Sequence, residues 1–158
     1  MKRLKQLVPL GLILSVSVLG LAFAKTEDDA SDLKLTADVT AANGSGISGI
    51  ATIHVGEDGL RGKLTADNLK VGHAYTVWFF YFHGSAQGGP SRFDSTVAED
   101  DDFTFRGHVG GLQTSSGDTI KLVIFDHPSL GPNSATRANN LLTPAGGSMA
   151  GQAVFTIP

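Results

Sequence analysis

Hydrophobic and polar residues alternate along several short segments, which is the pattern of a β-strand with one buried face. In residues 33–40, Leu33, Leu35, Ala37 and Val39 are separated by polar residues. The same period of two predicts further strands at 50–55, 60–66, 103–109 and 152–157. Between the strands at 50–55 and 60–66, Gly56-Glu-Asp-Gly59 predicts a tight hairpin, because Asp-Gly suits the positive φ of such turns.

Residues 73–83 are apolar on both faces. They hold the only Trp, both Tyr and three of the nine Phe, with a histidine at each end. A strand of this kind is expected at the centre of a sheet. Its second face is either covered by the protein itself or exposed for binding, and the first is favoured because monomers seldom expose large apolar patches.

A second nearly all-apolar strand is expected at 119–125, which brings the predicted total to seven strands with no amphipathic helix. This composition predicts an all-β fold, an antiparallel immunoglobulin-like β-sandwich of two sheets. A barrel is the alternative. The segments 84–102 and 129–151 are expected to be long loops.

The chain begins with a sequence typical of a secretory signal peptide. Lys2, Arg3 and Lys5 precede an apolar run at 7–21, and Ala22-Phe-Ala24 follows as a cleavage pattern. The alternative, a membrane anchor, needs about 20 apolar residues. We therefore expect a signal peptide at 1–24, an acidic flexible spacer at 25–32 and one β-sandwich domain at 33–158. The protein would be secreted or periplasmic.

The charge balance of the mature chain excludes several classes of partner. Loss of three basic residues with the leader moves the formal charge from −3 to −6. Such a surface argues against nucleic acid and anionic membranes, and the nine remaining Lys and Arg are scattered singly, which predicts no basic patch. The chain has no cysteine, so thiol nucleophiles, zinc thiolate sites and the usual blue-copper site are excluded.

Strand direction predicts where a site would lie. If seven consecutive strands alternate in direction, His54, His83 and His127 fall at one end of the sandwich, with both long loops. His73 and His108 then fall at the other end. Loops at one end of a rigid sandwich are a common place for function.

The favoured hypothesis is a non-catalytic binding module for an unknown small molecule or protein at this end. Its candidate ligand-binding residues are His83, Arg92, Asp94, Asp126, His127 and Arg137. The alternative is a zinc or copper site formed by His83, His127, Asp126 and His54, although no cofactor is required and no two histidines have a close ligand spacing. A third hypothesis is a structural surface protein that associates through its aromatic sheet face. No catalytic motif is present, so an enzyme is not favoured.

Two resemblances accompany these patterns. Residues 49–69, followed by the aromatic strand and a Gly-rich loop, resemble the layout of chordin-type (CHRD) domains, which are similar to copper/zinc superoxide dismutase in their sandwich. The dismutase ligand pattern is absent, since no H-x-H occurs, so no metal ligand is implied. Gly72-His-Ala-Tyr-Thr-Val-Trp78, with residues 120–127, is similar to a group of secreted bacterial proteins of unknown function. That likeness implies a fold and a compartment but no activity.

Overall fold

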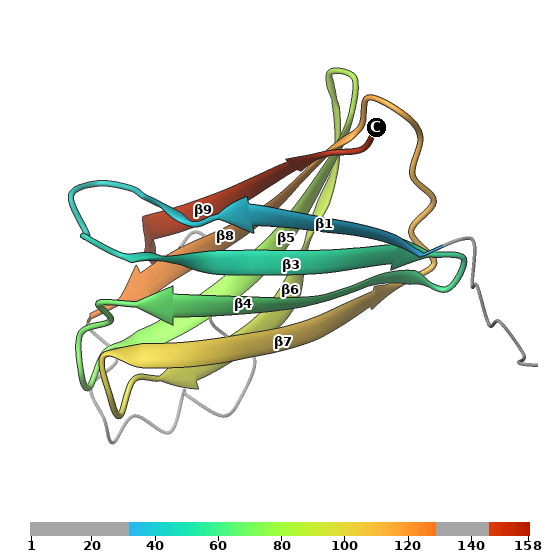
Figure 1. Ribbon diagram of the computed structural model, residues 1–158. Helices are drawn as coiled ribbons and strands as arrows, with labels where there is room; N and C mark the ends of the chain where they lie inside the picture. Colours follow the sequence, from blue (N-terminus) through green and yellow to red (C-terminus); the bar gives the residue numbers. More distant parts are fainter. Residues whose placement is uncertain (1–31, 129–145) are drawn as a thin grey trace, which may run out of the picture.

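The computed structural model describes residues 32–128 and 146–158, and these form two antiparallel β-sheets without an α-helix (Figure 1). The strands are β1 (Leu33–Asp38), β2 (Thr40–Ala41), β3 (Ser48–Gly56), β4 (Gly59–Asp67), β5 (Ala74–His83), β6 (Ala86–Val97), β7 (Asp102–Gly110), β8 (Thr119–His127) and β9 (Ser148–Thr156). One sheet has the order β1-β3-β4-β7 and the other β2-β9-β8-β5-β6. We call them the four-stranded and the five-stranded sheet.

The core lies between the two sheets, as the alternation of apolar residues requires. Ile53, Leu60, Leu64 and Phe105 of the four-stranded sheet are fully buried. Side chains of the five-stranded sheet meet them from the other side, among them Val77, Phe79, Ile120, Leu122, Ile124, Ala153 and Phe155. The predicted all-β architecture of two antiparallel sheets is therefore confirmed.

The hairpin between β3 and β4 forms where the sequence predicts it. Gly56 is paired with Gly59 across a turn of two residues. Gly59 has φ of 122°, and a Cβ there would overlap the carbonyl oxygen of Val109 on β7. Only glycine fits this position, so the turn fixes the register of β3 against β4.

The predicted number of strands is wrong, because the segment 84–102 is not one long loop. Most of it is β6, which pairs with β5 along the edge of the five-stranded sheet. Its first half contains Gly88, Gly89 and Pro90 and shows no alternation of apolar residues. The short β2 is the other addition.

A bulge in β6 closes one edge of the sandwich. Val77 is opposite Asp94 and Trp78 is opposite Arg92, so Phe93 is the extra residue between them. Its side chain is buried in the core beneath β7. Asp94 beside it accepts hydrogen bonds from the backbone N–H groups of Ser95 (2.7 Å) and Arg106 (2.8 Å), which ties β6 to the other sheet.

The predicted signal peptide at 1–24, nearly all of the predicted spacer and residues 129–145 lie outside the described residues. No helix among the described residues is long and apolar enough to span a membrane.

Replacing Gly107 by Ala should destabilise the protein by about 1–3 kcal/mol, the usual cost of overpacking a core. A Cβ at this position would lie 2.6 Å from both Cδ2 and the carbonyl oxygen of Phe93. Urea unfolding measures the loss. Gly89→Ala is the matched control, because a Cβ there meets nothing within 4 Å. Equal stability of the two variants would contradict the proposed packing of Phe93.

Candidate functional site

The structure separates His83 from His127. In the pairing of β5 with β8, Phe82 is opposite Thr119 and Ala74 is opposite His127. His83 follows Phe82, so the two histidines are nine residues apart along the strands, or about 30 Å at 3.3 Å per residue. The prediction that they share one end is wrong. Along the chain, β6 is an additional strand between β5 and β8, so β8 runs in the direction opposite to the one predicted.

This separation also removes the predicted zinc or copper site of His83, His127, Asp126 and His54. Asp126 lies beside His127, whereas His54 lies near the turn between β3 and β4 at the opposite end. Among the described residues, no three His, Asp or Glu side chains converge in a way that could hold a metal ion.

His127 is a buried structural residue. Its ring is 1% exposed, and its Nε2 lies 3.0 Å from Thr76 Oγ1, which also accepts a hydrogen bond from Trp78 Nε1 at 2.9 Å. The backbone of Gly147 packs on the ring so closely that a Cβ there would lie 2.5 Å from it. The packing leaves His127 no free surface with which to contact a ligand.

Two His–Asp pairs lie at opposite ends of β5. His73 Nδ1 is 2.8 Å from Asp126 Oδ1, and His83 Nδ1 is 2.7 Å from Asp118 Oδ1. The His83 side chain is 67% exposed, whereas the Asp118 side chain is almost completely buried. The buried carboxylate therefore orients an imidazole whose remaining face is open to solvent.

Asp118 is the centre of a polar cluster at this end. It accepts hydrogen bonds from the hydroxyl of Tyr81 and from the backbone N–H of Ser115 (2.6 Å), besides its contact with His83. The Tyr81 hydrogen bond lowers the pKa of the Asp118 carboxyl most, burial opposes this, and Ser115 and His83 lower it further. The same hydrogen bond raises the pKa of Tyr81.

The other predicted ligand-binding residues do not gather at one place. Arg92 is exposed on β6 opposite Trp78, and both carboxylate oxygens of Asp94 are engaged by backbone N–H groups. Arg137 lies outside the described residues. The predicted set therefore does not form one site within the part of the chain that the structure describes.

The outer surface of the four-stranded sheet assembles cations that the sequence separates. Lys34 is opposite His54, His54 is opposite Arg61, and Arg61 is opposite His108. Two residues further along β4, Lys63 is opposite Arg106. All six side chains are exposed. We call this set the cationic face: Lys34, His54, Arg61, Lys63, Arg106 and His108.

The cationic face corrects two predictions. It is a basic patch in a chain for which none was predicted, and it contains four of the nine Lys and Arg that follow residue 24. It also includes His108, which was predicted to lie at the end opposite His54 but shares a cross-strand row with it through Arg61. The signal available in the sequence was the hairpin, since a turn at Gly56–Gly59 places His54 opposite Arg61.

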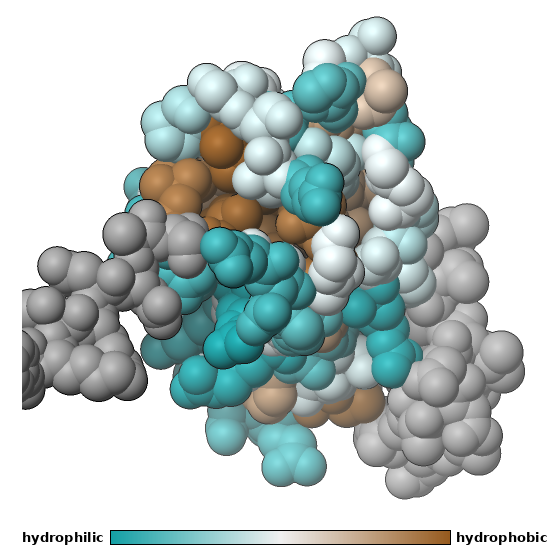
Figure 2. All heavy atoms as spheres, turned by 90° about the vertical axis from the view of Figure 1, so that its right-hand side faces the viewer, coloured by the Kyte–Doolittle hydropathy of each residue, from teal (hydrophilic) through white to brown (hydrophobic). Residues whose placement is uncertain are grey.

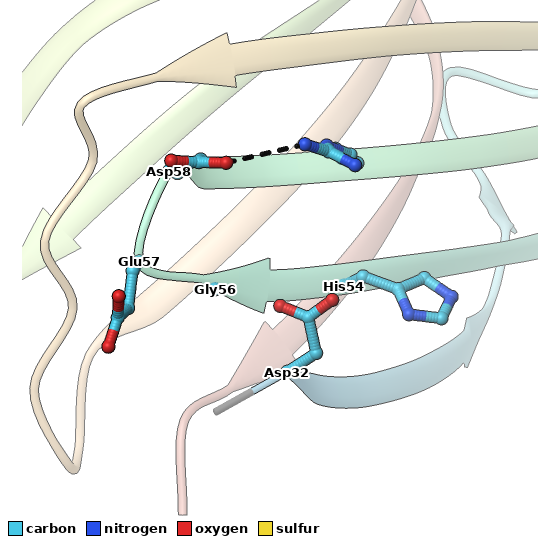
Figure 3. A pocket seen from close by; sticks show the side chains of 7 residues that line it. Asp32, His54, Gly56, Glu57 and Asp58 are labelled. Atoms are coloured by element: carbon cyan, nitrogen blue, oxygen red, sulfur yellow. Dashed lines mark ion pairs between the residues drawn. The ribbon is translucent and has the colours of Figure 1, made fainter. Parts of the chain in front are cut away.

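Shallow hollows open on and beside this face. One lies among its cations and is lined by Lys34, Thr52, His54, Arg61, Gly62, Lys63 and Arg106. Another lies near the β3–β4 turn, where Asp32 and Asp58 line it together with His54 (Figure 3). Asp58 forms an ion pair with Arg61 at 3.5 Å, although both side chains are largely exposed and the pair adds little stability.

The end of the molecule beside the turn has a different character. Figure 2 looks onto this end and shows apolar side chains in a hollow surrounded by polar ones. Leu33, Val55 and Leu112 line a pocket here, together with Gln113 and Thr114. These apolar side chains are the open end of the core, next to Tyr81, whose hydroxyl lies 3.1 Å from the Gln113 carbonyl oxygen.

Comparisons with protein-family models, curated proteins and solved structures found no match for this chain.

Replacing Asp118 by Asn should make the chain less sensitive to acid. A carboxyl whose pKa is lowered by folding stabilises the protein above the ordinary Asp pKa, and this contribution is lost as the pH falls through the lowered value. The stability difference between wild type and variant should thus be largest near pH 7 and shrink below about pH 4. Urea midpoints measured from pH 7 to pH 2 test this.

Asp100→Asn is the matched control, because Asp100 is exposed in the turn between β6 and β7. Its difference from wild type should stay small throughout. A stability difference between wild type and Asp118→Asn that does not change with pH would contradict the role of the Asp118 charge.

Proposed function

We propose that this chain is a secreted, non-catalytic binding module of immunoglobulin-like type that binds anionic ligands on its cationic face. The observation that supports this most directly is the pairing of cations on neighbouring strands. Lys63 is directly opposite Arg106, and Arg61 has an imidazole on each side. Like charges in such positions repel each other and destabilise a sheet. An anion that binds between them relieves this repulsion, which makes its binding more favourable.

The charge distribution supports a dedicated surface. The chain that follows the leader has a formal charge of −6, so an anion is repelled by the molecule as a whole. Binding must then depend on a local concentration of cations. Arg and Lys supply permanent charges and several donors each, which suits carboxylate, sulfate and phosphate groups.

The same surface favours binding over catalysis. The cationic face is an open sheet surface bordered by two threonine pairs. The side chains of Thr36 and Thr52 bond to each other at 3.3 Å, and those of Thr65 and Thr104 at 3.1 Å. None of its six members is a carboxylate that could act as a partner base. Secretion follows from the leader, and it would place the module where extracellular anionic polymers occur.

Lys63→Glu should weaken binding of dextran sulfate by about tenfold, which is about 1.4 kcal/mol and close to the value of one hydrogen bond to a charged group. Its stability should equal or exceed that of wild type, since a repelling pair with Arg106 becomes an attractive one. Titration calorimetry of the mature protein at low salt and urea unfolding measure the two effects.

Lys70→Glu is the matched control for this variant. Lys70 is exposed in the loop between β4 and β5 and lies outside the cationic face, so the same charge change should leave binding nearly unaltered. Absence of binding by wild type, or equal losses in both variants, would refute the proposed function.

The double variant His54→Gln/His108→Gln should bind dextran sulfate several-fold more weakly than wild type, because it removes the two imidazole donors that lie on either side of Arg61. Titration calorimetry of the mature protein at low salt measures the loss.

His83→Gln serves as the control here, since it removes an exposed imidazole that lies on the five-stranded sheet. This variant should keep the affinity of wild type. An affinity of the double variant equal to that of wild type would contradict the part of His54 and His108 in binding.

A further inference from the structure

We infer that the ligand of the cationic face is a linear acidic polysaccharide that lies across the four strands. This inference rests on the proposed function and adds the class and orientation of the ligand. Its first basis is the row Lys34–His54–Arg61–His108, with one residue from each strand. Neighbouring strands are about 4.8 Å apart, so the row extends over roughly 14 Å. A single sulfate or phosphate ion would meet only two of these four groups.

A second row runs parallel to the first and has a mixed character. It contains Arg106 on β7 and Lys63 on β4, followed by Thr52 on β3 and Thr36 on β1. The two rows are two residues apart along the strands, which is about 7 Å. The hollow lined by residues of both rows lies between them, so a chain placed there has cations on both sides and hydroxyl groups on one.

Carboxylates at both ends of the sheet determine the orientation. Asp32, Glu57 and Asp58 lie beyond the first row, at the β3–β4 turn. Asp38, Asp67 and Asp102 are exposed at the other end of the same surface. A polyanion that ran along the strands would pass over one of these groups of carboxylates. One that runs across the strands between the two rows meets cations on both sides, and its nearest carboxylate is Asp58, which is paired with Arg61.

The composition of the face selects among polyanions. The outward positions of the four strands contain no Phe, Tyr or Trp, so a single-stranded nucleic acid would find only the two small imidazole rings on which to stack its bases. Ile50 is the only large exposed hydrophobic residue among the strands of this sheet, and it is two positions beyond Thr52, so insertion into a lipid surface is not supported either. Cations with neighbouring hydroxyl groups suit a ligand that has both acidic and hydroxyl groups on each unit.

The spacing within the row is consistent with such a ligand. Successive cations are separated by one strand spacing, which is similar to the length of one sugar in an extended chain. Each acidic sugar could then meet one residue of the row. Because the contacts are linked, affinity should increase with the number of sugars until the row is filled.

The test is calorimetric titration of the mature protein with galacturonate oligomers from one to eight sugars at low salt. Affinity should rise at least about tenfold from the disaccharide to the tetrasaccharide and then level off, as expected for linked contacts on a site of limited length. Lys34→Gln and His108→Gln remove the two ends of the row and should each shorten the length at which affinity levels off. Lys70→Gln should leave the profile of wild type unchanged.

Two further probes separate this inference from the proposed function. Affinity that does not depend on oligomer length, or tighter binding of oligothymidylate or phosphatidylglycerol vesicles at matched charge, would overturn the polysaccharide while anion binding stands. The absence of binding to galacturonates and to dextran sulfate in a protein that binds oligothymidylate would do the same. The absence of binding to every anionic probe would overturn both.

Discussion

The burial of alternate side chains in the four-stranded sheet is the constraint on which the rest of the structure depends. Ile53, Leu60, Leu64 and Phe105 are fully buried, and each is worth about 1.5–3 kcal/mol relative to exposure. A slip of one residue in any strand would bring its apolar set into water and its polar set into the core. The outward row of cations is therefore fixed by the core behind it. The repulsion between Lys63 and Arg106 cannot be relieved by a shift of register.

The fold could be predicted where the sequence alternates and not where it does not. The alternation in β1, β3 and β4 indicated three strands and which face of each is buried, and the hairpin at Gly56–Gly59 followed from its turn residues. β6 was missed because Gly88, Gly89 and Pro90 have low strand propensity and its pairing with β5 is a tertiary effect. Its bulge at Phe93 depends on the space left by Gly107, a residue of another strand. The sequence around Phe93 contains no pattern that could predict its contact with Gly107.

The candidate site illustrates how one missed strand changes a functional hypothesis. His83 lies at the end of β5 as predicted, but the extra strand brings His127 to the opposite end, where it is buried with Thr76. The cationic face was missed for a different reason. Lys34 and His108 are 74 positions apart in the chain and meet in one row only through the pairing of β1, β3, β4 and β7. A count of scattered charges cannot show this, although the hairpin register already implied the pair His54–Arg61.

The distances on the cationic face show how the proposed anion binding is compatible with the negative net charge of the chain. At physiological ionic strength the Debye length is about 8 Å. Neighbouring cations in a row are about 5 Å apart and the two rows about 7 Å apart, so a bound anion experiences them together. Asp38 is four residues from Lys34 along β1, and Asp67 is four residues from Lys63 along β4, which is about 13 Å in each case. The carboxylates at that end are therefore largely screened from a ligand held between the rows, while they still repel one that extends toward them. The net charge of the molecule governs its solubility and distant encounters, and the local arrangement governs what the sheet surface can bind.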